Sequence, residues 1–259
     1  MPNDSTAKTI IVALLLCLVC SVIVSTAAVA LKPIQLKNQS LDKKRNILQV
    51  AGLYQEGRAV EDLFRQVEAK VVDLASGDYV EGMNAREYDQ RKAAKDPEQN
   101  HIIPLDLDIA HIKQRAKRAT VYLVKNDDRI TYYILPVHGY GLWSTLYGFL
   151  VLEEDANTIH GLQFYEHAET PGLGGEVDNP NWRAKWPGKA VYNVAGIPAI
   201  EVVRGSVNSG KSEAIHQVDG LAGATLTSRG VTRLLQYWMS DQGFGPYLQK
   251  ARSQRGESS

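Results

Sequence analysis

The chain has 259 residues, enough for one or two domains, and 44% of them are hydrophobic, an ordinary share for a globular protein. Lysine and arginine together number 29, and so do aspartate and glutamate, which leaves a formal net charge of zero. This balance argues against the broad positive surface that nucleic-acid binding requires, so we expect no nucleic-acid partner.

The N-terminal segment is apolar over a length that can cross a membrane. The run between Lys8 and Lys32 holds no charged residue. About 20 apolar residues span a bilayer, so residues 9–31 are predicted to form a single transmembrane helix after a short tail, residues 1–8. A cleaved signal peptide is the alternative, because Ala28-Val29-Ala30 resembles a cleavage site. However, the apolar core of a signal peptide normally stops after roughly 7–15 residues.

The charges and cysteines around this segment give weaker signals. Cys17 and Cys20 are the only cysteines, and with no second pair and apolar neighbours we interpret them as small apolar residues. Basic residues are more numerous after the span than before it, which favours a cytoplasmic body, although large domains are translocated in spite of such charges. The basic residues that follow are Lys32, Lys37, Lys43, Lys44 and Arg45.

Residues 32–112 are predicted to form a helical preamble followed by a charged linker. Apolar residues recur at i, i+3, i+4, i+7 and i+11, which indicates an amphipathic helix that Gly77 would end. The stretch Asn84–Asn100 is rich in charge and contains Pro97, so it is predicted to be a solvated linker or an exposed insertion. The helical stripe consists of Val60, Leu63, Phe64, Val67 and Val71.

Residues 113–250 are predicted to form the main domain, which begins with β-strands. Four runs are rich in β-branched and aromatic residues, and turn-forming residues separate the two runs of each pair. Two hairpins follow, and they predict an antiparallel sheet of at least four strands. The runs are residues 119–125 and 130–137 around Asn126-Asp127-Asp128, and residues 146–153 and 158–167 around 154–157.

A helix that packs on this sheet is predicted near the C-terminus. Thr227 or Ser228 could cap its N-terminus. A helix on an antiparallel sheet makes the fold class α+β. The last residues, 251–259, are polar and are predicted to form a flexible tail. The apolar stripe of the helix consists of Val231, Leu234, Leu235 and Trp238.

Two segments are richer in glycine and hydroxyl groups than packing requires: His167–Val177 and Asp219–Gly230. In the second, small residues precede Thr225 directly ahead of the predicted helix. A helix N-terminus offers unpaired N–H groups and a positive dipole end, so a phosphate would fit there. The hydroxyls could equally do no more than cap the helix. Threonine is a poor nucleophile unaided, so the spacing alone does not predict a covalent bond.

The run Asp219-Gly220-Leu221-Ala222-Gly223-Ala224-Thr225 resembles the flavinylation motif of bacterial FMN-binding subunits, D-x-x-(S/T)-G-A-(S/T). The resemblance implies that a flavin transferase attaches FMN covalently, through a phosphoester, to Thr225. Ala222 stands where the family usually has serine or threonine, so it cannot supply a hydrogen bond from that position. The other cofactor-binding residues implied in this segment are Asp219, Gly223, Ala224 and Thr227.

The run Glu169–Gly174 resembles a second signature of the family, E-T-P-G-L-G. The resemblance implies that this loop lines the pocket of the flavin ring. Its first two residues could hydrogen-bond the flavin or its ribityl chain. Without the resemblance the loop would be read as a turn between a strand and a helix. The implied cofactor-binding residues are Glu169, Thr170, Gly172 and Leu173.

A third block, Gly139–Ser144, also resembles the family in its form G-Y-G-L-W-S. The resemblance implies that Trp143 and Ser144 belong to the flavin site, where the indole could stack on the ring or lie at its edge. An equally good interpretation makes Trp143 a core residue that follows a hairpin.

No other cofactor chemistry is supported by the sequence. His138, His160 and His167 lie among acidic residues, but none has the spacing of a H-E-x-x-H site, so we expect no metal. The glycine-rich loops match neither G-x-x-x-x-G-K-(S/T) nor G-x-G-x-x-G. We therefore expect no NADH to bind this chain directly.

Along its whole length the chain is similar to the C subunits of Na+-translocating NADH:quinone oxidoreductases. The G subunit of Rnf-type electron transport complexes is the alternative, because it shares the anchor and both flavin motifs. The additional region from Leu53 to Ile103 and the form G-Y-G-L-W-S favour the C subunit over the G subunit. A structural assembly protein that lacks flavin is a further alternative.

The resemblance to these C subunits implies partners and a location. It implies a place among six subunits in a complex of the bacterial inner membrane, with a single-pass anchor and a periplasmic soluble domain. Other subunits would oxidise NADH, reduce quinone and conduct Na+. This chain would relay electrons through its covalent FMN.

Overall fold

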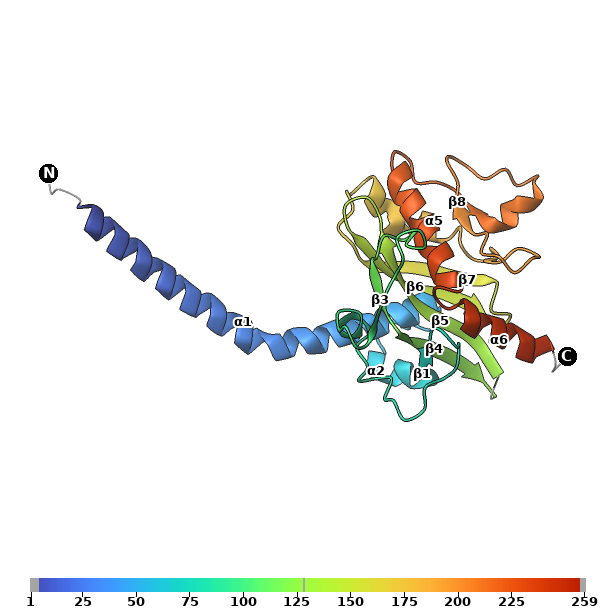
Figure 1. Ribbon diagram of the computed structural model, residues 1–259, viewed down its shortest axis with the longest axis horizontal. Helices are drawn as coiled ribbons and strands as arrows, with labels where there is room; N and C mark the ends of the chain where they lie inside the picture. The colour runs from blue at the N-terminus through green and yellow to red at the C-terminus, as the bar shows by residue number, and fades with distance from the viewer. Residues whose placement is uncertain (1–4, 128, 257–259) are drawn as a thin grey trace. The chain divides into compact units, whose positions relative to one another are not determined.

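The computed structural model describes residues 5–127 and 129–256, and its chain divides into two compact units, Met1–Lys44 and Arg45–Ser259. Helix α1 (Thr6–Val50) makes up the described part of the first unit and supplies the first residues of the second. Figure 1 shows the ribbon, with α1 in blue.

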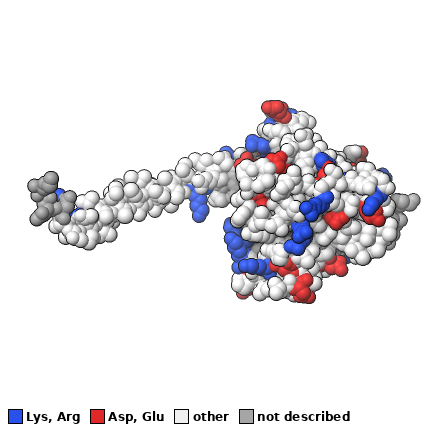
Figure 2. All heavy atoms as spheres, turned by 90° about the horizontal axis from the view of Figure 1, so that it is seen from above, with Lys and Arg blue, Asp and Glu red and all other residues white. Residues whose placement is uncertain are grey.

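Helix α1 is the one helix among the described residues that is long and apolar enough to cross a membrane, with a mean hydropathy of 2.9 in its most apolar window. The apolar part of α1 shows neither acidic nor basic side chains in Figure 2. The helix is longer than the predicted span, because the residues after Lys32 continue it and Pro33 lies inside it without ending it.

The second unit is built on a five-stranded antiparallel sheet in the order β1-β4-β5-β6-β7. Both predicted hairpins are confirmed, and Asp128 of the first predicted turn lies outside the described residues. The strands are β1 (Val67–Asp73), β4 (Arg118–Asn126), β5 (Arg129–Tyr140), β6 (Thr145–Glu153) and β7 (Ile159–Glu166).

Both faces of the sheet are buried, which explains why the strands read as nearly continuous apolar runs. In β4, Leu123 belongs to the larger core cluster, whereas Tyr122 and Val124 belong to a second cluster on the opposite face. Helix α5 (Thr225–Met239) covers the first face (Figure 1). The second cluster includes the last residues of α1, Ile47, Leu48 and Val50, together with Leu63 and Phe64.

The amphipathic helix predicted from Val60 to Val71 is wrong in its second half. The helical part is short, and Val67–Asp73 is strand β1, paired residue for residue with β4. Val67 and Val71 lie on one side of either a helix or a strand, because positions i and i+4 share a face in both. The β-branched side chains and the pairing with β4 decide in favour of the strand.

The charged segment Asn84–Asn100 is held to the sheet at one point. It contains the short helix α3 (Gln90–Ala93), which Asp89 caps. The guanidinium of Arg91 donates to both carboxylate oxygens of Glu166, at 3.1 and 2.9 Å, and its carbon lies 3.6 Å from the centre of the Tyr147 ring. The segment is therefore more than a solvated linker.

Helix α5 begins at Thr225 and its N-cap is Ala224, so neither Thr227 nor Ser228 caps it; both are buried inside its first turns. The predicted apolar stripe is confirmed, since all four of its residues are buried. Helix α6 extends through the first part of the segment predicted to be a tail, and residues 257–259 lie outside the described residues.

The remaining elements are short. They are α2 (Val60–Leu63), η1 (Phe64–Gln66), β2 (Asn100–Ile102), β3 (Gln114–Ala116), η2 (Gly174–Asp178), α4 (Pro180–Arg183), β8 (Glu201–Val202), η3 (Ser212–His216), β9 (Gln217–Val218) and α6 (Gly245–Gly256).

Candidate functional site

The three motif segments meet at the N-terminal end of α5, and a buried carboxylate joins them. Oε1 of Glu169 accepts hydrogen bonds from the backbone N–H groups of Leu142, Trp143 and Ser144, at 3.1, 2.9 and 3.1 Å. Its Oε2 accepts from the hydroxyl of Thr227 at 2.8 Å. Glu169 therefore ties the loop after β5 to the first turn of α5.

These hydrogen bonds keep the carboxylate ionised. Burial would raise the pKa of Glu169, but the Thr227 hydroxyl and the three backbone N–H groups outweigh that effect and lower the pKa below its ordinary value. A carboxylate that accepts several such bonds is held in one orientation. Glu169 is only 5% exposed, so its hydrogen-bonding capacity is used inside the protein rather than at the surface.

Two glycines of the motifs make room for this carboxylate. A Cβ atom added to Gly141 would lie 2.7 Å from Oε1 of Glu169. One added to Gly174 would lie 2.6 Å from the Thr227 hydroxyl and 2.7 Å from Oε2 of Glu169. Both positions exclude any larger residue, so these glycines are required for packing rather than for flexibility.

Ser144 adds a second link between the same segments. Its hydroxyl donates to Oε1 of Glu169 at 3.4 Å and accepts from the backbone N–H of Ala168 at 2.8 Å. The carbonyl of Thr170 accepts from the N–H groups of Leu173 and Gly175, at 3.1 and 2.9 Å. The E-T-P-G-L-G segment is therefore a compact turn with defined contacts.

The loop that leads to α5 is fixed at its first residue. Oδ1 of Asp219 accepts from the N–H of Val207 at 2.7 Å, and Oδ2 accepts from the ammonium of Lys185. The indole N–H of Trp182 donates to the Asp219 carbonyl at 2.8 Å. Further along, the Leu221 N–H donates to the hydroxyl of Ser228 at 3.1 Å, which closes the loop onto α5.

Thr225 is exposed as the first residue of α5, in contrast to Thr227, which is fully buried. Apolar side chains of the three motif segments are exposed as well: Trp143 at 66%, Leu226 at 53% and Leu173 at 44%. A Cβ added to Gly223 would lie 2.9 Å from Cδ2 of Leu173, which brings the second and first motif loops into direct contact. The site thus combines an accessible hydroxyl, a helix N-terminus and exposed apolar groups.

The structure separates the sequence-predicted site residues into two groups. Glu169, Ser144, Thr227 and Asp219 make hydrogen bonds within the protein. The interpretation of Trp143 as a core residue is wrong, because its side chain is largely exposed. The other exposed site residues are Thr170, Gly172, Leu173, Gly223 and Thr225, whereas Ala224 is buried.

Ala222, the departure from the motif, is also exposed. A serine or threonine hydroxyl there would lie at the surface, so its absence leaves no unsatisfied polar group inside the loop.

Sequence reasoning missed Lys185 and Trp182, the donors to Asp219. They lie 34 and 37 positions from Asp219, outside every motif. No local pattern joins residues so far apart, and no sequence signal pointed to them.

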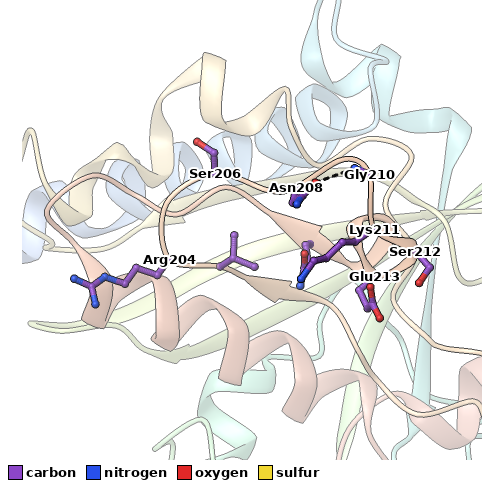
Figure 3. Close-up of a pocket in the computed structure, with 9 residues that line it drawn as sticks. Arg204, Ser206, Asn208, Gly210, Lys211, Ser212 and Glu213 are labelled. Carbon is purple, nitrogen blue, oxygen red and sulfur yellow. Dashed lines mark hydrogen bonds between the residues drawn. The ribbon is translucent and has the colours of Figure 1, made fainter.

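An open hollow of about 660 Å³ lies beside the acceptor loop rather than in it, lined by residues between Val203 and Gln217 (Figure 3). None of the motif residues lines the hollow. The same loop supplies the Val207 N–H that binds Asp219.

Comparison with known proteins agrees with this geometry. The family described as "FMN-binding domain" matches residues 141–240. The C subunit of the Na+-translocating NADH-quinone reductase of Pseudomonas aeruginosa is 52% identical over 260 aligned positions, covering 99% of each chain. Its counterpart from Vibrio vulnificus is 52% identical over 251 positions, covering 96% of this chain and 97% of the relative.

A solved structure is also similar. The crystal structure of NqrC from Shewanella oneidensis has a TM-score of 0.76 and 35% identity, covering 83% of this chain and 99% of that one. The alignments with the relatives, at identity near one half, span nearly the full length and so include all three motif segments and the apolar helix. The chain therefore belongs to the family of C subunits of the Na+-translocating NADH-quinone reductase, a membrane complex, and carries the FMN-binding domain of that family.

Proposed function

We propose that this chain carries FMN in a phosphoester with Oγ of Thr225 and relays electrons within the Na+-translocating NADH-quinone reductase. The observation that carries the proposal is the exposed Thr225 hydroxyl at the first position of a 15-residue helix, inside the acceptor motif. The first N–H groups of a helix have no partner within it and attract a phosphate.

The attachment is a phosphoryl transfer without change of oxidation state. The bond between Oγ of Thr225 and phosphorus forms while the pyrophosphate bond of a flavin dinucleotide breaks. The hydroxyl proton goes to solvent and a nucleoside monophosphate leaves. Since threonine is a poor nucleophile by itself, a flavin transferase must supply the base.

The residues of this chain hold the group and shape its surroundings. FMN supplies reversible electron transfer when it is bound. Trp143, Leu173 and Leu226 offer exposed apolar surface for the ring, and Thr170 and Gly172 border it. Glu169 does not reach the surface, and it holds the Trp143 backbone against α5. The electrostatics of the site depend on this fixed carboxylate and on the N-terminus of α5.

We place the soluble domain on the periplasmic side, as the resemblance to the C subunits implies, with α1 as its single anchor. The basic residues after the span oppose this placement only weakly, because large domains are translocated regardless of such charges. Reporter fusions at the C-terminus test it: alkaline phosphatase is expected to be active and green fluorescent protein dark. The reverse pattern would place the domain in the cytoplasm.

Intact-mass analysis tests the attachment. The full chain, made in cells that also contain the flavin transferase, is expected to gain roughly the mass of FMN less one water, located on the peptide that contains Thr225. Thr225→Ser should keep the adduct, since it keeps the hydroxyl, and Thr225→Ala should lose it. An undiminished adduct in Thr225→Ala would refute the acceptor. A colourless, unmodified wild-type chain would favour a structural role without flavin.

A further inference from the structure

The first residue of the acceptor loop is bound by a segment that no flavin motif contains. Lys185 donates to the Asp219 carboxylate, and Trp182 donates to the Asp219 carbonyl at 2.8 Å. Both donors come from α4 and the residues directly after it. One short segment therefore binds both the side chain and the main chain of Asp219.

This segment provides a firm base for the two donors. Asn179 caps α4 through the N–H of Asn181, and Pro180 occupies the first helical position. Trp182 is buried and packs edge-on against the fully buried Trp186, with ring centres 5.3 Å apart. The backbone that carries Lys185 is therefore anchored in the core.

Asp219 is also held from its other side. Val207 donates to Oδ1, so the carboxylate is bonded at both oxygens. The N–H of Gly220 donates to the Gly205 carbonyl at 2.8 Å, and a Cβ on Gly220 would lie 2.3 Å from the Val203 carbonyl. The side chain of Asp219 is 25% exposed. The carboxylate thus acts inside the chain.

We propose that Lys185 is a positioning residue for flavin attachment: through Asp219 it holds the acceptor loop in the conformation that presents Oγ of Thr225 to the flavin transferase. The inference rests on the proposed attachment to Thr225. Lys185 is partly exposed and lies outside both core clusters. Its loss should therefore reduce the population of the presented loop and leave the domain folded.

The consequence is a slower attachment rather than an absent one. A partly exposed ion pair contributes up to about 1 kcal/mol. By the equivalence of 1.4 kcal/mol to a factor of ten, this amounts to about a fivefold change in the fraction of presented molecules. Lys185→Met should accordingly lower kcat/KM for FMN transfer by about threefold to fivefold.

The experiment measures the initial rate of covalent FMN incorporation into the purified full chain, with purified flavin transferase and FAD. Lys185→Arg keeps the charge and should restore the rate to within about twofold of the wild type. Lys250→Met is a matched control, because Lys250 forms a surface ion pair with Asp78, outside the acceptor loop. It should leave the rate unchanged. All variants should unfold at the same temperature.

Two results would overturn the inference. If Asp219→Asn slows incorporation but Lys185→Met does not, the transferase reads the aspartate directly and Lys185 positions nothing. If Lys185→Met and Lys185→Arg are equally slow, the positive charge is not what matters. A wild-type chain that takes up no FMN on Thr225 would refute the proposed attachment itself, whereas a normal wild type beside an equally fast Lys185→Met refutes only the role of Lys185.

Discussion

Glu169 illustrates how a residue in a cofactor motif can act through the backbone. Its carboxylate gathers three N–H groups of one loop and the hydroxyl of Thr227, and the glycines at 141 and 174 leave space for it. Trp143 is presented at the surface because its own N–H is held from below. The residues with the most exposed side chains in the site thus depend on one of the most buried polar groups.

Replacing that carboxylate should destabilise the domain. Glu169→Gln keeps the shape but turns an amide NH2 toward donors, so at least one buried group loses its partner, at a cost of about 1–3 kcal/mol. Urea unfolding followed by tryptophan fluorescence measures this. Thr227→Val, which removes one of the four bonded groups, should have a smaller effect. Equal stability of Glu169→Gln and the wild type would show that the network contributes little.

The same carboxylate gives a pH dependence with a definite sign. Because its pKa is lowered in the folded chain, its contribution to stability is complete above its ordinary pKa, and it is lost as the pH falls through the folded value. Glu169→Gln should remove this part of the acid sensitivity.

A second pH effect is expected from His138 at higher pH. Burial, with a smaller contribution from Arg91, lowers the pKa of His138 to about 4 from the ordinary 6.5. Between these values the unfolded chain binds a proton and the folded chain does not, so stability should fall as the pH drops from 6.5 toward 4, by at most about 3 kcal/mol. His138 stacks on Tyr147 and packs against Trp238, so His138→Phe keeps aromatic packing.

Urea unfolding of both proteins between about pH 7.5 and 4.5, a range that brackets the ordinary histidine pKa, tests this prediction. The wild type should lose stability across that range faster than His138→Phe. Parallel curves would mean that the imidazole is not the group responsible.

At the scale of elements, the approach of α5 to the sheet positions the acceptor. A Cβ on Gly139 would lie 2.4 Å from Cβ of Leu234, and the indole N–H of Trp238 donates to the His138 carbonyl at 2.7 Å. The helix therefore contacts β5 through backbone rather than through intervening side chains. Thr225 and the G-Y-G-L-W-S loop keep a fixed spacing because the two elements touch so closely.

Gly230→Ala should reveal this contact. In an open helix position alanine would be favoured over glycine by up to about 1 kcal/mol. Here its Cβ would lie 2.6 Å from the Tyr140 carbonyl and 2.9 Å from Cα of Gly141, both backbone atoms that cannot rotate away. We expect a net destabilisation of about 1–3 kcal/mol, typical of overpacking. Arg229→Ala, at an exposed neighbouring position, serves as the control, and an unfolding temperature raised by Gly230→Ala would contradict the close packing.

The elements that the sequence predicted well are those that local patterns define. The hairpins were marked by turn residues between β-branched runs, and α5 by its apolar stripe. Strand β1 was missed because its spacing fits two periodicities, and only pairing with β4, far along the chain, distinguishes them. The same reason hid the Lys185–Asp219 pair. Motifs located the candidate site, while the division into buried and exposed site residues required the fold.

At the scale of the whole molecule, the anchor helix and the soluble unit overlap in sequence. The end of α1, with Ile47, Leu48 and Val50 almost fully buried, belongs to the core on one face of the sheet. The sequence placed these residues in a preamble, since three apolar side chains among basic and polar neighbours give too short a pattern to assign. The end of the membrane-anchoring helix is thus at the same time a core element.

This overlap fixes where the chain can be cut. A variant that begins at Arg45 keeps these side chains and should be soluble without detergent and cooperatively folded, since the second unit begins there. A variant that begins at Gly52 loses Ile47, Leu48 and Val50. Each fully buried aliphatic side chain contributes roughly 1.5–3 kcal/mol, and whole domains are stable by only about 5–15 kcal/mol. We expect the shorter variant to be unfolded or aggregated, as measured by circular dichroism and thermal unfolding. Equal unfolding temperatures for the two would show that α1 ends outside the core.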